Sequence, residues 1–244
     1  MNRFLALTLT AFASLTALSA HAAAPAKGAV TFDRVYVPNG FDSNDLVQIV
    51  GEGTFANACY RPAEVTVRVD QAAKKIFLGP AAYKYSGFCL QVVLPFERTI
   101  DLGLIPAGDY TIVGEESATS NNRDKVLGTI KVKEAVKEEA DDFLYAPISQ
   151  AFIRQSDTAG NAEIVLQGDF PSNCMVLEDV KTSFQGNNVI VVQPIAKMED
   201  RNGCLRGRYP FSKVINVGDI KADRYLLHVR SLNAKAINTL IDLK

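Results

Sequence analysis

Hydrophobic and polar residues alternate along much of this chain, a pattern that predicts β-strands rather than helices. The strands predicted in this way include segments 46–53, 64–70 and 125–132, and again 162–168, 188–194 and 224–231. Turn-forming residues such as Asn39-Gly40 and Pro106-Ala107-Gly108 separate these segments. About seven short strands per 100 residues, without a competing helical period, predict an antiparallel β-sandwich.

The pattern occurs twice in the sequence. A shift of 115 residues, the separation of Cys89 and Cys204, aligns the two halves without a gap from about Val47 to Gly114. The repeat predicts a tandem duplication, and each copy is long enough to bury its own core. We expect domain 1 at residues 28–133, a charged linker at 134–144 and domain 2 at 145–244. Matched pairs include Gly53 and Gly168, Phe55 and Phe170, Cys59 and Cys174, Pro95 and Pro210, Phe96 and Phe211, and Tyr110 and Tyr225.

The four cysteines are expected to form one disulfide inside each copy. Cys59 would pair with Cys89, and Cys174 with Cys204, so that both bridges close the same span of 30 residues. A zinc site is the alternative, but it lacks paired Cys-x-x-Cys knuckles, and His228 is the only histidine after residue 22.

The first 22 residues have the composition of a secretory signal peptide. Arg3 is followed by an apolar run from Phe4 to Ala20, and small residues precede the expected cleavage after Ala22. The sequence therefore predicts export to the periplasm or the extracellular space. Without residues 1–22 the formal net charge of −1 becomes −2, because Arg3 is lost and no acid is. A nearly neutral chain without a further long apolar segment is not expected to bind nucleic acid or to insert into a membrane.

A short segment of domain 1 is typical of a particular sandwich corner. Leu104, Pro106 and Tyr110 precede an alternating strand in "LIPAGDYTIVG", and this spacing resembles that of fibronectin type III and immunoglobulin-like domains. The resemblance implies a tyrosine whose hydroxyl binds nearby backbone and closes one end of the core. Domain 2 keeps the tyrosine, as Tyr225.

Two other repeated positions have expected structural roles. Pro95 and Pro210 are expected to interrupt their strands, because proline cannot donate to a β-ladder. Phe96 and Phe211, which follow them, are expected to place large rings in the two cores.

The sequence contains no recognisable catalytic constellation. His228 aligns with Val113, an apolar strand position, and is expected to be a half-buried or interfacial strand residue. Asp42 and Asp45 have oxygens suited to calcium but not the spacing of a calcium loop, so a polar turn is favoured. We therefore predict a protein that is not an enzyme and that uses neither a cofactor nor a metal.

The copies differ most before and after their second cysteine. Domain 1 has Tyr83, Tyr85, Phe88 and Val93 there, where domain 2 is polar and carries Arg206 and Arg208. If Leu90 and Leu205 face inward, Val93 and the two arginines face outward. These four domain 1 residues form a candidate binding surface. They could instead pack over a loop of their own domain or against the other domain.

Three hypotheses for function remain. The preferred one is an exported binding or scaffold module whose partner is a protein or a surface polymer. The first alternative is a secreted hydrolase inhibitor that acts through a disulfide-held loop, at 55–61 or 83–88. The second is a carboxylate-based enzyme with inward-facing acids from both domains around one cleft.

Overall fold

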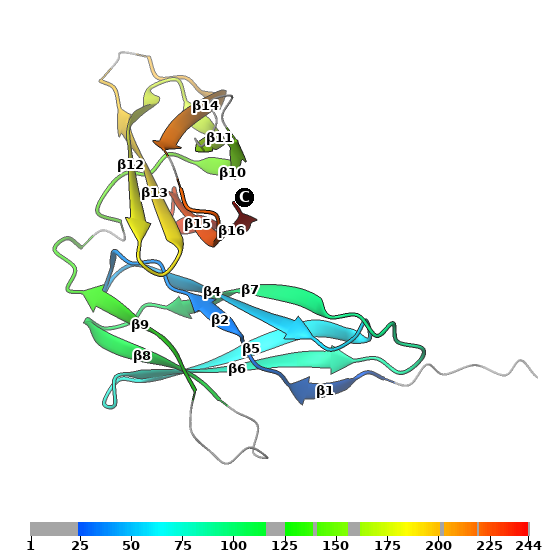
Figure 1. Ribbon diagram of the computed structural model, residues 1–244. Helices are drawn as coiled ribbons and strands as arrows, with labels where there is room; N and C mark the ends of the chain where they lie inside the picture. Colours follow the sequence, from blue (N-terminus) through cyan, green and yellow to red (C-terminus); the bar gives the residue numbers. More distant parts are fainter. Residues whose placement is uncertain are drawn as a thin grey trace, which may run out of the picture.

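The computed structural model describes residues 24–115, 125–138, 141–155, 162–200, 203–218 and 220–243. The expected signal peptide lies outside these residues. Within them all regular secondary structure is β-strand, and the strands form two β-sandwich domains (Figure 1). Each domain contains one disulfide, as predicted.

Domain 1 packs a three-stranded sheet against a larger one. The smaller sheet has the order β2-β4-β7. The larger has the order β1-β6-β8-β9-β3, and β5 pairs with the other side of β6. The strands are β1 (Ala26–Ala29), β2 (Arg34–Tyr36), β3 (Phe41–Asp42), β4 (Val47–Phe55), β5 (Tyr60–Asp70), β6 (Lys75–Lys84), β7 (Leu94–Gly103), β8 (Gly108–Gly114) and β9 (Lys125–Lys133).

Domain 2 has the same arrangement with fewer strands. Its smaller sheet has the order β10-β11-β14, and its larger sheet has the order β12-β13-β15-β16. The strands are β10 (Ile148–Gln155), β11 (Ala162–Ser172), β12 (Met175–Gln185), β13 (Val189–Met198), β14 (Arg206–Gly218), β15 (Arg224–Ser231) and β16 (Lys235–Asp242).

Each domain also contains parallel pairing, which differs from the antiparallel arrangement expected from the sequence. β6 runs parallel to β8, and β13 runs parallel to β15. The short β3 is also parallel to β9. Between β6 and β8 the chain crosses to the other sheet and forms β7, and β14 does the same in domain 2. This intervening strand reverses the chain direction, so the next strand returns parallel to the first.

Stacked phenylalanine pairs lie in both cores. The rings of Phe55 and Phe96 stack with centroids 4.2 Å apart in domain 1. Phe170 and Phe211 stack at the same distance in domain 2. The prediction that Phe96 and Phe211 contribute to the cores is therefore confirmed.

The tyrosine corner is present in both domains. The Tyr110 hydroxyl donates a hydrogen bond to the Pro106 carbonyl at 2.9 Å. The Tyr225 hydroxyl donates to the Lys221 carbonyl at 3.2 Å. Each bond reaches back four residues and ties the tyrosine to the turn before its strand, as the resemblance implies.

The expectation that two prolines interrupt their strands is wrong. Pro95 lies within β7, opposite Thr54, and Pro210 lies within β14, opposite Asp169. Both strands are at the edge of a three-stranded sheet. An edge strand has one unpaired side, where the missing N–H of proline costs no ladder hydrogen bond.

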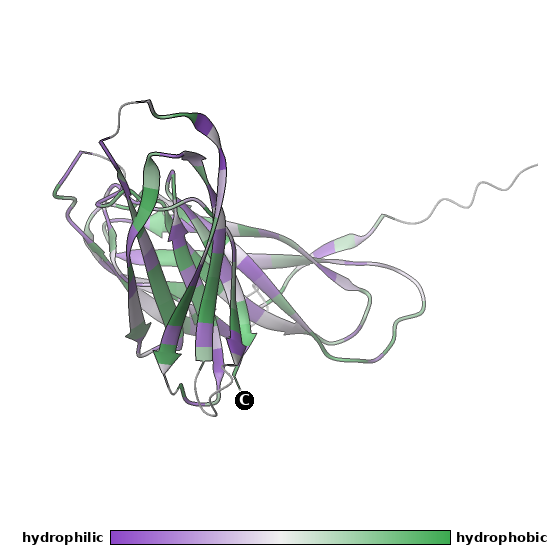
Figure 2. Ribbon diagram, turned by 90° about the horizontal axis from the view of Figure 1, so that it is seen from above, coloured by the Kyte–Doolittle hydropathy of each residue, from purple (hydrophilic) through white to green (hydrophobic). Residues whose placement is uncertain are grey.

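The domains pack through the outer faces of two sheets. Their strands run across one another in Figure 1, and hydrophobic bands lie on the strands of both domains in Figure 2. Tyr36 and Val50 of domain 1 form a buried cluster with Val189, Val191 and Leu226 of domain 2. This third apolar cluster joins the two sandwiches.

Candidate functional site

The domain 1 disulfide lies where three segments of the chain meet. Cys59 directly precedes β5, and Cys89 lies in the segment between β6 and β7. Their Cα atoms are 5.3 Å apart. Ala58 N–H donates to the Leu90 carbonyl at 3.0 Å, and Tyr85 N–H donates to the Cys59 carbonyl at 2.9 Å. The bridge and these two hydrogen bonds hold the segment before β7 against the start of β5.

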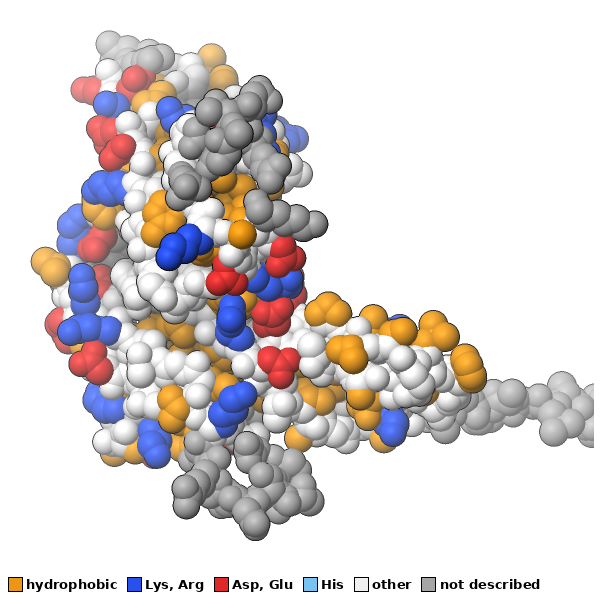
Figure 3. All heavy atoms as spheres, in the orientation of Figure 1, with side chains coloured by type: hydrophobic (Ala, Val, Ile, Leu, Met, Phe, Trp, Pro, Cys, Tyr) orange, Lys and Arg blue, Asp and Glu red, His pale blue; other side chains and the backbone are white. Residues whose placement is uncertain are grey.

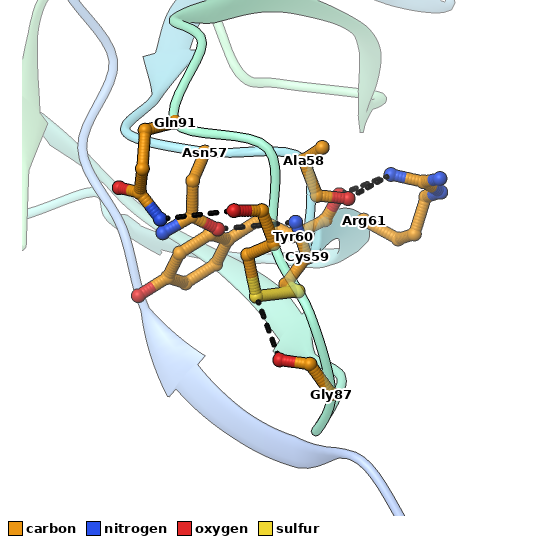
Figure 4. Close-up of a disulfide and its surroundings, with 8 residues drawn as sticks. Asn57, Ala58, Cys59, Tyr60, Arg61, Gly87 and Gln91 are labelled. Carbon is orange, nitrogen blue, oxygen red and sulfur yellow. Dashed lines mark hydrogen bonds between the residues drawn. A yellow bond between two sulfur atoms is a disulfide. The ribbon is translucent and has the colours of Figure 1, made fainter.

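Polar side chains support the same turn (Figure 4). Asn57 Oδ1 accepts a hydrogen bond from Cys59 N–H at 3.0 Å. Arg61 Nη1 donates hydrogen bonds to the Ala58 carbonyl at 3.0 Å and to the Tyr60 carbonyl at 2.8 Å. Gln91 Nε2 donates to the Cys89 carbonyl at 3.1 Å. These hydrogen bonds order the backbone around the disulfide, while several apolar side chains beside it are exposed.

These exposed side chains form what we call the apolar tip: Tyr85, Phe88, Leu90, Val92 and Val93. Phe88 is 94% exposed, Val93 69% and Leu90 59%. No charged residue occurs from Tyr85 to Phe96. The tip lies at the end of domain 1 that points away from domain 2, where hydrophobic side chains gather in Figure 3. Exposed apolar groups of this kind are typical of contact surfaces, so the tip is the candidate binding site.

Three of the four residues predicted to form a binding surface are exposed in the structure, and one is half-buried. Tyr85, Phe88 and Val93 belong to the apolar tip, whereas Tyr83 is half-buried in β6. The tip is remote from the interface between the domains, so these residues do not pack against domain 2.

The expectation that Leu90 and Leu205 face inward is wrong, because both are largely exposed. That expectation assumed strand alternation, but both residues precede the strand that follows them. Sequence reasoning therefore missed Leu90 and Val92. The uncharged run after Lys84 is the sequence signal that could have found them.

The equivalent region of domain 2 has the same backbone frame with different side chains. The Cys174–Cys204 bridge spans a Cα–Cα distance of 5.5 Å, and Asn173 N–H donates to the Leu205 carbonyl at 3.2 Å. There Arg206 and Arg208 are exposed, and Arg208 pairs with Asp169 at 2.8 Å. The apolar character is therefore particular to domain 1.

A cluster of charged and polar side chains lies between the domains. Arg230 is buried, and its guanidinium contacts Asp45 Oδ2 at 3.3 Å and the Gly40 carbonyl at 2.6 Å. It also donates to the Tyr145 hydroxyl at 3.4 Å. Burial raises the pKa of Asp45, while the positive charge of Arg230 acts in the opposite direction. Burial likewise raises the pKa of Asp141, in the linker.

His228 lies in β15 beside this cluster and is 1% exposed, so it is buried more deeply than the half-buried position expected. Its ring contacts Phe41 of domain 1 edge-on, with centroids 5.7 Å apart, as expected of an interfacial residue. Nδ1 donates to Asn238 Oδ1 at 2.7 Å, and Asn238 Nδ2 donates to Gln48 Oε1 at 3.0 Å. Burial lowers the pKa of His228 to about 4.

This cluster is small for a catalytic cleft. The hollow lined by Asp45, Asp141, His228 and Arg230 has a volume of about 20 Å³, enough for about one water molecule. Its acids come from domain 1 and the linker, whereas the carboxylate-enzyme alternative needs acids from both domains.

Asp42 and Asp45 form a hydrogen-bonded turn. Asp42 N–H donates to Asp45 Oδ2 at 3.0 Å, and Asn44 N–H donates to Asp42 Oδ1 at 3.3 Å. Among the described residues no group of three or more His, Cys, Asp and Glu side chains is placed to hold a metal ion. The carboxylates therefore serve the turn and Arg230.

Comparison with known proteins gives one match, and it concerns the fold. Residues 49–123, less than half of the chain, match the family model of the ORF11 beta-sandwich domain. No curated protein and no solved structure matches the chain. No helix in the described part of the chain is long and apolar enough to cross a membrane. What the comparisons establish is that domain 1 is similar to a β-sandwich family.

Proposed function

We propose that this protein is an exported, non-enzymatic binding module that contacts a protein or a surface polymer through the apolar tip of domain 1. The observation that carries the proposal is the exposure of Phe88, Leu90 and Val93 on a segment held by a disulfide. Burying a large apolar side chain is worth about 1.5–3 kcal/mol. A segment that is already ordered loses little further conformational entropy on binding.

Export is supported by the composition of residues 1–22 and by the two disulfides, since disulfides persist in oxidising compartments. Cleavage after Ala22 would give a mature chain that begins at Ala23. Mass spectrometry of the protein from the native host tests this: an intact N-terminus, or reduced cysteines in the native protein, would contradict the proposal.

The test of the tip uses a matched pair of substitutions. Leu90→Ser and Leu205→Ser change equivalent positions with similar exposure in the two domains. Wild-type and variant proteins are immobilised and exposed to the native envelope fraction, and the retained partner is then identified and titrated. We expect Leu90→Ser and Phe88→Ser to weaken its binding by about tenfold or more, and Leu205→Ser to leave it unchanged. Equal binding by all variants would contradict a role for the tip.

The hydrolase-inhibitor alternative uses the same disulfide-held segment, so its test differs in the readout. If the partner retained by the tip is a hydrolase, stoichiometric loss of its activity on adding the protein favours inhibition. Unchanged activity at saturating protein favours the binding module.

A further inference from the structure

β7 is an edge strand of the smaller sheet of domain 1, and one side of its backbone is free of pairing in the described part of the chain. Among the strands that the structure describes, it pairs with β4 on one side only, and β5 likewise pairs only with β6. Arg98 Nη2 of β7 reaches the Pro62 carbonyl of β5 at 3.0 Å, so the two edges lie on the same side of the sandwich. Unpaired N–H and C=O groups on such an edge are a template for another strand.

The space between these edges is hollow. A groove of about 510 Å³ lies between β5 and β7, lined by Ala63, Glu64, Val65, Val67, Arg98, Thr99, Ile100 and Asp101. Val65 and Val67 face the core of domain 1 but remain only half-buried. Ile100, opposite them, is buried. The valine side chains of β5 therefore lack part of their apolar cover.

A second groove lies on the opposite face of β7, beside the same residues of the strand. It has a volume of about 290 Å³ and lies between β7 and domain 2, lined by Val50, Glu97, Arg98, Thr99, Asn238 and Leu240. Arg98 and Thr99 line both grooves. Successive side chains of a strand point to opposite faces. A strand placed beside β7 would thus direct alternate side chains into the two grooves.

We propose that an extended segment of another protein pairs with the free edge of β7 at Glu97–Asp101. Its inward side chains are apolar and cover Val65 and Val67, while its outward ones lie beside Asn238 and Leu240. Main-chain hydrogen bonds to β7 supply affinity, and the alternate side chains supply specificity, as in other cases of β-strand addition.

The charges around the groove indicate what the segment carries. Glu64 and Asp101 line the first groove and Glu97 lines the second, and Arg98 is the cation among the residues lining both. Glu64 is paired with Lys27, so Glu97 and Asp101 are the acids left to meet a bound segment. Lysine or arginine at its polar positions would complement this acidic rim. A second copy of the chain fits poorly, because pairing β7 with β7 would bring Glu97 and Asp101 close to the same acids.

The proposal stands independently of the apolar tip. The probe is a fluorescent ten-residue peptide with valine at alternate positions and threonine and lysine between them. A control peptide has the same composition with its valines contiguous. Binding to the oxidised full-length mature chain is followed by fluorescence anisotropy, and the contact is located by amide hydrogen exchange.

Two substitutions test the groove, each with a control at the equivalent position of domain 2. Val67→Lys places a charge in the groove, and Thr182→Lys is its control. Glu97→Lys reverses an exposed rim charge without touching the core, and Ser212→Lys is its control. We expect Val67→Lys and Glu97→Lys each to weaken binding by about tenfold or more, and both controls to leave it unchanged.

Binding should also protect the amides of Glu97–Asp101 from exchange, and Phe88→Ser should not affect it. The proposal is overturned if the alternating peptide shows no saturable binding or if the control peptide binds equally well. It is also overturned if Glu97→Lys has no effect, or if the chain dimerises through β7 in sedimentation experiments. If Phe88→Ser no longer retains the partner of the apolar tip but still binds the peptide, the tip and the β7 edge are separate sites.

Discussion

At the scale of single residues, two glycines make room for the stacked rings of the cores. Gly53 lies opposite Phe96 across β4 and β7, and Gly168 lies opposite Phe211 across β11 and β14. A Cβ atom added to Gly168 would lie 2.9 Å from the Phe211 ring and 1.9 Å from the Pro147 carbonyl oxygen. The second contact is with backbone, which cannot turn aside as a side chain can.

We expect Gly168→Ala to lower the free energy of unfolding by about 1–3 kcal/mol, the usual cost of overpacking a filled core. Gly186→Ala is the control, because nothing lies within 4 Å of its added Cβ, and alanine there should be neutral or slightly stabilising. Urea denaturation of the oxidised proteins measures both, and equal midpoints would contradict the account.

At the scale of elements, the two tyrosine corners have the same geometry in different surroundings. Tyr110 is buried, and its hydroxyl also lies 3.3 Å from Lys74 Nζ. Tyr225 is only partly buried. The Tyr110 hydrogen bond is partly shielded from water, whereas the Tyr225 bond is exposed. A hydrogen bond shielded from water is electrostatically stronger than one in contact with it, and removing the Tyr110 hydroxyl also takes a partner from Lys74.

Tyr110→Phe should therefore lower the free energy of unfolding by about 1 kcal/mol or more, and Tyr225→Phe by clearly less. Thermal unfolding followed by circular dichroism gives the comparison. A larger loss for Tyr225→Phe would show that burial does not set the strength of the corner.

Local sequence features predicted the elements well. Alternation gave the strands, cysteine spacing gave both bridges, and Phe96 and Phe211 were placed correctly. The errors share one physical cause, which is that pairing partners are not visible in one strand's own sequence. Pro95 is tolerated because β7 is an edge strand, and Leu90 is exposed because its segment pairs with none of the described strands. The parallel pairs likewise depend on where the chain crosses between sheets.

At the scale of the whole molecule, the strands that form the interface between the domains were not predicted, although the sequence carries a signal for one of them. Residues 189–192 are a continuous apolar run, Val-Ile-Val-Val, and all four are buried. Ile190 and Val192 face the core of domain 2, while Val189 and Val191 face domain 1. A run that is apolar on both faces is typical of a strand covered on both sides, but it does not identify what covers it.

Removing the buried guanidinium of Arg230 from this interface should destabilise the folded protein. Arg230→Met leaves Asp45 without its charge partner and should lower the free energy of unfolding by about 3–5 kcal/mol. Arg208→Met removes an arginine from an exposed pair with Asp169 and should change it by about 1 kcal/mol or less. Denaturant titration of both variants decides, and a small effect of Arg230→Met would mean that Asp45 finds other partners.

His228 should make the stability of the protein depend on pH. Its pKa falls from 6.5 to about 4 on folding, so the unfolded chain binds a proton first as the pH decreases. Stability from this group is fully present above pH 6.5 and is lost as the pH falls towards 4, by up to about 3 kcal/mol. The raised pKa values of Asp45 and Asp141 act in the opposite direction, so a variant is needed to isolate the histidine.

His228→Asn retains an N–H donor near the position of Nδ1 but does not titrate. The difference in unfolding free energy between wild type and this variant should therefore decrease between pH 6.5 and 4. A pH-independent difference would exclude His228 as the titrating group.

The connectivity of the two bridges also bears on how the chain matures. Each cysteine pairs with its nearest neighbour in the sequence, Cys59 with Cys89 and Cys174 with Cys204. A chain made from its N-terminus presents the first pair before the second exists, and leading domains generally fold first. An oxidant that joins thiols in order of emergence would thus give the native set directly, and no isomerase would be needed to correct it.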